Sequence, residues 1–154
     1  MIRDILEFGN PVLREKCEEV KVFDKELGRT LDDMYETMME AEGIGLAAPQ
    51  IGILKRFVVI DTGERPGRIE LVNPIITSMW GKQFEPEGCL SCEGKKGIVQ
   101  RPMHVQVKAY NRFGKRVRYH GRELLARAFC HEIDHLNGIL FIDKVLEWVE
   151  EEDE

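Results

Sequence analysis

The chain lacks the features of secreted and membrane-spanning proteins. Four cysteines among 154 residues are too few for a disulfide-rich scaffold, so we expect a reducing compartment. No stretch approaches the ~20 consecutive apolar residues of a membrane-spanning helix. The N-terminus carries Asp4 and lacks the apolar segment of a signal peptide. We therefore expect a cytoplasmic protein with no membrane partner.

The acidic surplus of the chain is confined to its C-terminus. The net charge is −6, yet six of the 28 acidic residues lie in residues 147–154, and the other 22 equal the lysines and arginines in number. Because a hydrophobic share of 43% suffices for one core, we expect a single domain over residues 1–146, followed by an acidic tail over 147–154. This tail would repel nucleic-acid phosphates, and the sequence gives no sign of direct sequence-specific binding to nucleic acid.

Periodic apolar residues predict two helices. The first spans Asp24–Ala41, with Asp24 as its cap and a core-facing stripe at Leu27, Leu31, Met34 and Met38. The second spans about Arg122–Asn137, and Gly138 is placed for a C-terminal cap.

Short strand signals fill the interval between the two helices. They occur at residues 56–61, at 69–73 and 75–78, which Pro74 separates or bends, and in a hairpin whose loop is 111–115. Residues 139–142 are predicted to form another strand or a packed turn. A helix, several strands and a second helix predict an α+β fold with antiparallel sheets.

The octapeptide at residues 131–138 carries the strongest chemical signal. His131 and His135 lie one above the other on a helix and can reach one metal ion. Glu132 is rotated by about a quarter turn from His131, so it can approach the open side of the metal as a base. The alternative without a metal is a pair of buried histidines whose ring nitrogens are satisfied by hydrogen bonds. We favour a metal-dependent hydrolase whose antiparallel sheets pack around a central metal-bearing α-helix.

The site needs a third ligand, because catalytic sites usually hold a metal with three protein side chains. Cys89 is the best candidate among the remaining thiols, carboxylates and histidines, since Gly88 lets the backbone come close to a metal. Cys130 points about 100° away from His131 around the helix, so we expect it to pack in the core.

Cys92 leaves other interpretations open. With Cys89, His131 and His135 it could complete a closed Cys₂His₂ site, which would make the chain a zinc-stapled binding module. Against this, residues three apart on an extended strand face opposite sides, and Glu132 would have no purpose. A redox C-x-x-C is weaker, because such motifs normally open a helix. A general H-E-x-x-H metallopeptidase is the remaining alternative.

Three segments resemble, in order and spacing, the signature motifs of bacterial peptide deformylases. They are GIGLAAPQ at 43–50, EGCLS at 87–91 and HEIDHL at 131–136, and the segment Asn10–Arg14 also looks like that family. The resemblance covers nearly the whole chain. It implies removal of the N-formyl group from the initiator methionine of nascent polypeptides, with release of formate. It also implies one divalent metal ion, typically Fe²⁺, with Zn²⁺, Ni²⁺ or Co²⁺ able to occupy the site.

The resemblance also implies catalytic roles. The metal ligands would be Cys89, His131 and His135. Glu132 would take the proton of the metal-activated water and pass it to the leaving amine. The Gln50 side chain and the Leu90 backbone N–H would donate to the oxyanion.

Further residues are expected around this centre. The substrate site would be walled by Ile44, Gly45, Leu124 and Ala128, with the Gly45 backbone offered to a peptide that adds as a strand. Glu87, next to the expected ligand, would orient the site through Arg101.

The sequence departs from the family at two places. Cys92 stands where the family usually has an aliphatic residue, and a second thiol makes the site easier to oxidise. Members that dock on the ribosome continue into a long C-terminal helix, whereas this chain is acidic around and after Trp148. The acidic segment argues against a ribosome contact at that end.

Overall fold

The computed structural model describes residues 1–150, so the last four residues of the expected acidic tail, 151–154, lie outside the described residues. Two α-helices are present, α1 (Lys25–Glu40) and α2 (Leu124–Leu136). The strands are β1 (Gly45–Ala47), β2 (Phe57–Ile60), β3 (Ile69–Trp80), β4 (Gln83–Cys89), β5 (Cys92–Arg101), β6 (His104–Tyr110), β7 (Arg116–Arg122) and β8 (Val145–Val149). Short 3₁₀ turns occur at η1 (Pro11–Arg14), η2 (Ala48–Ile51) and η3 (Phe141–Asp143).

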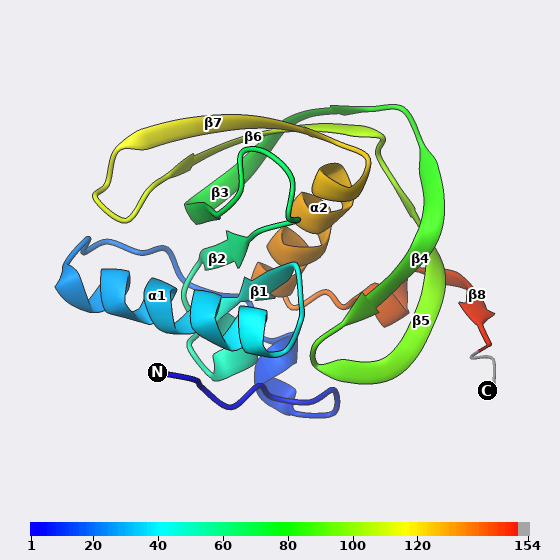
Figure 1. Ribbon diagram of the computed structural model, residues 1–154, viewed down its shortest axis with the longest axis horizontal. Helices are drawn as coiled ribbons and strands as arrows, with labels where there is room; N and C mark the ends of the chain where they lie inside the picture. The colour runs from blue at the N-terminus through cyan, green and yellow to red at the C-terminus, as the bar shows by residue number, and fades with distance from the viewer. Residues whose placement is uncertain (151–154) are drawn as a thin grey trace.

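The strands form two antiparallel sheets that lie on either side of helix α2 (Figure 1). The larger sheet has the order β1-β2-β3-β6-β7, and the smaller has the order β4-β5-β8. The expected α+β fold, with antiparallel sheets around a central helix, is confirmed.

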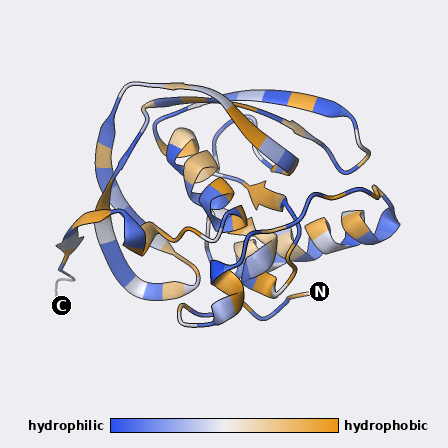
Figure 2. Ribbon diagram, turned by 180° about the vertical axis from the view of Figure 1, so that it is seen from behind, coloured by the Kyte–Doolittle hydropathy of each residue, from blue (hydrophilic) through white to orange (hydrophobic). Residues whose placement is uncertain are grey.

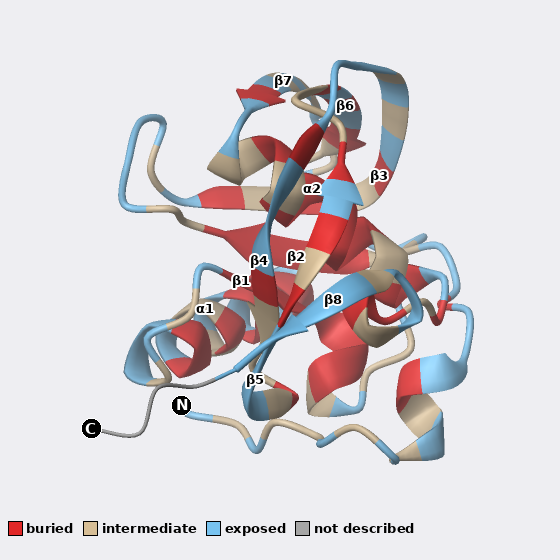
Figure 3. Ribbon diagram, turned by 90° about the vertical axis from the view of Figure 1, so that its right-hand side faces the viewer, coloured by how far each residue is buried: buried red, intermediate tan, exposed pale blue. Residues whose placement is uncertain are grey.

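The larger sheet is buried on both faces at strand β2. Val58 and Ile60 pack in one cluster with Phe129 of α2, whereas Phe57 and Val59 pack in a second cluster with the α1 stripe Leu27, Leu31, Met34 and Met38. Figure 3 shows this buried material concentrated on β2 and on the inner sides of both helices. Because both faces of β2 are covered, its sequence is a continuous apolar run. Figure 2 shows the same apolar segments inside and polar ones on the outer strands.

Local sequence signals placed both helices correctly to within two residues. The Asp24 side chain accepts a hydrogen bond from the Leu27 N–H at 3.0 Å, which caps α1. Gly138 follows α2 with a φ of +73°, as a C-terminal cap requires.

Pro74 was expected to separate or bend the two strand segments; it does not separate them, because β3 continues through it. The pairing of β3 with β6 shifts register between Val72 and Ile75, and this bulge accommodates Pro74. Asn73, at a φ of +52°, turns its amide to both backbone groups of Val20, accepting from its N–H and donating to its carbonyl. The hairpin of β4 and β5 had no expected counterpart, since β4 contains Pro86 and two glutamates, β5 is rich in Gly and Lys, and neither strand has a regular apolar alternation.

The C-terminal end of the described chain is a strand. Strand β8 pairs with β5, with Trp148 opposite Gly97 and Val149 opposite Lys96. The proposed boundary between residues 146 and 147 therefore falls within β8, and the division into domain and tail stays a prediction. No helix within residues 1–150 is both long enough and apolar enough to cross a membrane.

Gly138 is needed for more than its backbone angle, and this gives a stability prediction. A Cβ at Gly138 would overlap the Arg14 carbonyl oxygen, whereas one at Gly63, which has a φ of +84°, would meet no atom within 4 Å. We expect Gly63→Ala to cost about 1 kcal/mol from backbone strain alone, and Gly138→Ala about 3 kcal/mol or more. Urea unfolding of both variants measures this difference. Equal losses of stability in the two variants would contradict the role of this contact, because they would show that the Arg14 backbone can move away from residue 138 at no cost.

Candidate metal centre and active site

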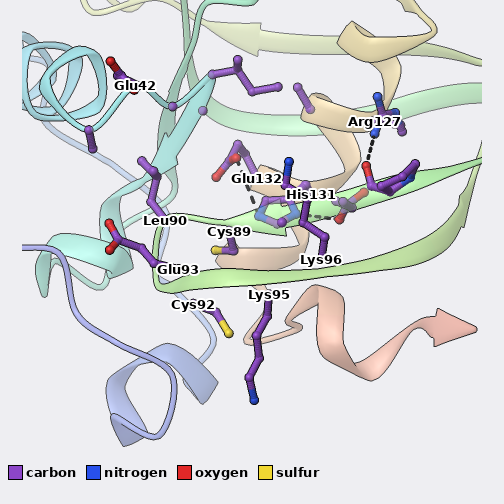
Figure 4. A pocket seen from close by; sticks show the side chains of 18 of the residues that line it. Glu42, Cys89, Leu90, Cys92, Glu93, Lys95, Lys96, Arg127, His131 and Glu132 are labelled. Carbon is purple, nitrogen blue, oxygen red and sulfur yellow. Dashed lines mark hydrogen bonds and ion pairs between the residues drawn. The ribbon is translucent and has the colours of Figure 1, made fainter. Parts of the chain in front are cut away.

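Helix α2 and the end of strand β4 bring three metal-ligating side chains together. The donor atoms of Cys89, His131 and His135 all lie within 4.8 Å of one another. The Cys89 Sγ is 3.4 Å from the His135 Nε2. Both histidines are on the buried face of α2, as their spacing of four residues dictates. The three expected ligands are therefore brought to one point, and Figure 4 shows two of them, Cys89 and His131.

The Glu132 carboxylate lies beside this cluster without belonging to it. Its Oε2 is 4.0 Å from the His131 Nε2, and its Oε1 is buried without a hydrogen-bond partner among the described residues. Gly45 of β1 faces it, and a Cβ at Gly45 would overlap the carboxylate. This close approach explains why the first motif has glycine at this position.

Gln50 is fixed next to the cluster by both ends of its amide. Its Oε1 accepts from the Ala47 N–H at 2.9 Å, and its Nε2 donates to the Ser91 Oγ at 3.0 Å. The same Nε2 is 3.5 Å from the Cys89 Sγ. The side chain is almost fully buried, so the amide donor is held in one orientation beside the Cys89 sulfur.

Leu90 lies in the two-residue turn that joins β4 to β5. Its side chain packs against the first motif, since a Cβ at Gly43 would come within 2.6 Å of the Leu90 Cδ1. The turn therefore places the Leu90 backbone directly after the Cys89 ligand and against the segment that leads into β1.

A buried ion-pair network supports His131 from behind. The Arg101 guanidinium contacts both carboxylate oxygens of Glu87, at 3.1 and 2.7 Å, and the Asp134 Oδ2 at 2.7 Å. The His131 Nδ1 donates to the Glu87 Oε2 at 2.6 Å. Because an ionised carboxylate only accepts hydrogen bonds, this contact leaves the His131 Nε2 as the ring atom available to a metal.

The network also fixes the charge of Glu87. Burial alone would raise the pKa of this carboxyl, but the hydrogen bonds from His131 and Arg101 lower it to about 2. Glu87 is therefore anionic at neutral pH, which suits an acceptor for a ligating histidine.

The buried groups at the centre of the site have strongly perturbed pKa values. Burial raises the pKa of Glu132 to about 7. Burial would lower the pKa of His131, but the adjacent Glu132 charge and the bonds to Cys89 and Glu87 raise it well above its ordinary value. Burial and the neighbouring His131 lower the pKa of His135 well below its ordinary value. Such clustering of perturbed groups is typical of an active site.

A cavity of about 420 Å³ opens onto this centre. Its walls include the four expected substrate-site residues Ile44, Gly45, Leu124 and Ala128, together with Cys89, Leu90, His131 and Glu132. Strands β1 and β4 are the edge strands of their respective sheets, and both line the cavity. Figure 4 shows the side chains that border it.

Cys92 stays apart from the metal-ligating cluster, but the reason expected from the sequence is wrong. Cys89 and Cys92 do not share one extended strand; they face each other as register partners across the turn between β4 and β5. Cys92 is nevertheless absent from the ligand cluster found among the described residues. Cys130 packs in the core, where burial raises the pKa of its thiol to about 11.

The donor set fits a divalent transition-metal ion. Two imidazoles and one thiolate are three of the ligands that such ions take at catalytic sites, leaving one position open. The His131 ring is oriented by a carboxylate, as is usual for ligating histidines. The Glu132 carboxylate, one oxygen of which has no hydrogen-bond partner among the described residues, lies beside these three side chains.

Sequence reasoning missed three residues at the site. Asp134 binds the far side of Arg101, Ser91 holds the Gln50 amide, and Arg127 lines the cavity and donates to the Pro86 carbonyl. Asp134 had a signal, because it lies three residues after His131 on the same helix. The Arg127 contact joins α2 to β4 and had no local signal.

The Glu87 network predicts a specific loss. We expect Glu87→Gln to lower stability by about 2–4 kcal/mol, because Arg101 would lose its buried anionic partner and keep only the half-buried Asp134. We also expect roughly 10–100-fold weaker metal binding, since His131 loses its anionic acceptor. Unfolding in urea and metal competition against a chelator test both effects. Glu85→Gln, on the exposed side of the same strand, is the matched control, and an equally large change there would contradict the role of the network.

Comparison with known proteins agrees with this geometry. The family model described as polypeptide deformylase matches residues 2–151. The peptide deformylase of Caldicellulosiruptor bescii is 55% identical over 152 residues, which is 99% of this chain and 90% of that protein. The peptide deformylase of Alkaliphilus metalliredigens is 57% identical over 145 residues, which is 94% of this chain and 97% of that protein.

Solved structures show the same similarity. The crystal structure of a peptide deformylase from Legionella pneumophila superposes with a TM-score of 0.91 at 45% identity, covering 94% of this chain and 86% of that one. The structure from Thermotoga maritima also gives 0.91, at 40% identity, covering 94% and 98%. The chain therefore belongs to the peptide deformylases, metal-dependent hydrolases that remove the N-formyl group from the N-terminal methionine of nascent polypeptides.

Proposed function

We propose that Glu132, Gln50 and Leu90 carry out the deformylation chemistry in this chain, at a divalent ion held by Cys89, His131 and His135. The observation that carries the proposal is the Glu132 carboxylate. It is buried, has an unpartnered oxygen and lies beside the Cys–His–His cluster at the wall of the cavity. Because no described residue forms a hydrogen bond to this oxygen, its burial is not explained by a structural contact, which favours a chemical role.

An ion bound there would supply an activated water and polarise the formyl carbonyl. We propose Fe²⁺ as the ion in the cell, with Zn²⁺, Ni²⁺ or Co²⁺ able to replace it, since mixed nitrogen and sulfur ligands suit each of them.

Glu132 moves the proton. Its carboxylate takes a proton from the attacking water and returns it to the amine that leaves as the formamide C–N bond breaks. A pKa near 7 suits this two-way role at neutral pH. Because Gly45 has no side chain, the backbone of β1 leaves room for the carboxylate next to the substrate.

Gln50 and Leu90 stabilise the oxygen of the formyl group as it gains negative charge. The Gln50 Nε2 is held by Ser91 at 3.0 Å and lies 3.5 Å from the Cys89 Sγ, so it faces the reacting centre without needing to move. The Leu90 N–H belongs to the turn directly after the ligand. Fixed donors of this kind are worth about 3 kcal/mol each to the transition state.

The cavity suits a peptide that enters between two sheet edges. Strands β1 and β4 both end their sheets at the cavity, so an extended peptide can pair with Gly45 on one side. Leu124 and Ala128 of α2, with Ile44 directly before β1, supply the apolar wall for the methionine side chain. A general metallopeptidase and a zinc-stapled module are not favoured, since the family match points to deformylation.

The setting of the reaction follows from its substrate. We propose that the enzyme acts in the cytoplasm on formyl-methionyl nascent chains. The acidic C-terminal segment does not support ribosome contact at that end.

The role of Glu132 is tested by release of formate from formyl-Met-Ala-Ser with iron-loaded protein under anaerobic conditions. We expect Glu132→Gln to lower kcat by roughly 10²–10⁴-fold with unchanged metal content. Glu40→Gln, at the exposed end of α1, should keep full activity. An inactive wild type, or an active Glu132→Gln, would overturn the proposal, and cleavage of unformylated peptides would identify a peptidase instead.

Gln50 should act on the transition state more than on substrate binding. We expect Gln50→Met to lower kcat by about 10²–10³-fold with KM little changed, because the donor matters only once charge develops on the oxygen. Exposed Gln100→Met on β5 is the control. Thermal unfolding of both variants separates a lost donor from a lost fold, and a change confined to KM would contradict the role.

A further inference from the structure

The charged side chains on the outward face of strands β6 and β7 are all basic. Their apolar residues alternate inward to pack on α2, and the intervening residues are exposed or partly exposed. The charged members of this outward set are Lys108, Arg116, Arg118 and Arg122, and the histidines His104 and His120 share the face. These six residues are called the basic face below.

The basic face is not neutralised by the described part of the chain. Among residues 1–150, only Arg122 has an acidic partner, Glu123 at 3.3 Å, and both side chains are about two-thirds exposed. Lys108 lies directly opposite Arg118 in the β6–β7 ladder. Like charges in directly opposed positions destabilise a sheet, so the arrangement costs stability in the free protein.

Cations next to the basic face, unlike most of those on it, do have acidic partners. Arg112, in the loop between β6 and β7, pairs with both Asp32 and Glu70, and Arg68 pairs with the same two acids. The chain has 28 acidic residues and a net charge of −6. A face with four cations and no acid is therefore a marked segregation of charge.

A cluster of stacked aromatic rings forms one end of the basic face. Trp80 of β3 lies opposite His104, with ring centroids 4.9 Å apart and planes at 9°. The His120 ring stacks with Trp80 at 5.4 Å. Trp80 is 45% exposed. An exposed, rigid aromatic surface next to cations is the combination on which proteins stack unpaired bases.

We propose that the basic face binds RNA, with the cations on its phosphates and the Trp80 cluster against an unpaired base. We favour RNA over an anionic membrane, because the exposed side chains of β6 and β7 are charged or polar and because Trp80 is held in a ring stack with two histidines, which suits stacking on a base. Such binding depends on the phosphate charge and on base stacking, and it does not distinguish one base sequence from another. It agrees with the expectation that no sequence-specific nucleic-acid binding occurs.

Binding at this face leaves the active site free. The cavity is lined by β1, β4, β5 and α2, whereas the basic face lies on the side of β6 and β7 turned away from α2, at the outer margin of the molecule (Figure 1). An enzyme whose substrates emerge beside RNA would thus be held near them without blocking the cavity. The proposal does not rest on the catalytic residues, since none belongs to the basic face.

The proposal is tested by fluorescence anisotropy of a labelled unpaired RNA titrated with metal-loaded protein at about 50 mM and about 200 mM salt. We expect binding that weakens steeply with salt. The double variant Lys108→Glu and Arg118→Glu should bind at least about tenfold more weakly, with a shallower salt dependence. The matched control is Lys16→Glu with Lys21→Glu, which makes the same change in net charge at exposed positions before α1.

Three further measurements test base stacking, the integrity of the fold and binding to membranes. Trp80→Ala should weaken binding of unpaired RNA several-fold and leave duplex RNA unchanged, since only unpaired bases can stack. Full formate release by the charge variants would show that the fold and the active site are intact. The proposal is overturned if wild type does not bind RNA, if the control loses as much affinity, or if anionic phosphatidylglycerol vesicles bind and RNA does not. If wild type binds neither RNA nor vesicles, the cations serve to protect the edge strand β7 from pairing with other chains.

Discussion

Arg101 is a buried cation, 3% exposed, whose guanidinium joins the smaller sheet to the central helix. It lies at the end of β5 and binds Glu87 on β4 and Asp134 on α2, and Glu87 in turn holds the ring of His131. Burying a charge is tolerated only when its partners satisfy it. The positions of β4, β5 and α2 are therefore fixed together, and with them the relation between the Cys89 ligand and the two histidines.

Close backbone approaches complete the site on its other side. Gly45 lies where a Cβ would overlap the Glu132 carboxylate, and Gly43 lies where one would enter the Leu90 side chain. The first motif thus contacts both the turn of the second and the helix of the third. Neither glycine has a positive φ, so the backbone conformation does not require glycine there. The close contacts with Glu132 and Leu90 do. The same contacts shape a cavity between two sheet edges, where an extended peptide can be read by backbone hydrogen bonds.

The two faces of the larger sheet serve different purposes. One packs on α2 and carries the apolar core behind the metal centre. The other is covered by α1 over β1 and β2, but along β6 and β7 it presents cations to solvent. Residues 1–146 contain equal numbers of acids and bases, so composition gave no hint of this face. Alternation along two strands collects the bases on one side, while α1 holds many of the acids.

The sequence by itself determined the two helices, their caps, the fold class and the family. The helices and their caps depend on residues close together in the chain: Asp24 caps three residues away, and His131 and His135 share a face because a turn takes about 3.6 residues. The fold class follows from the order of the elements, and the family from three motifs in order and spacing. The β4–β5 hairpin, the bulge at Pro74 and the partners of Arg101 needed the tertiary structure. So did the convergence of Gln50, Cys89 and α2, whose contacts join residues 39 to 46 positions apart. Local periodicity cannot encode such pairs, since they form only when the sheets close around the helix and burial forces each polar group to find a partner.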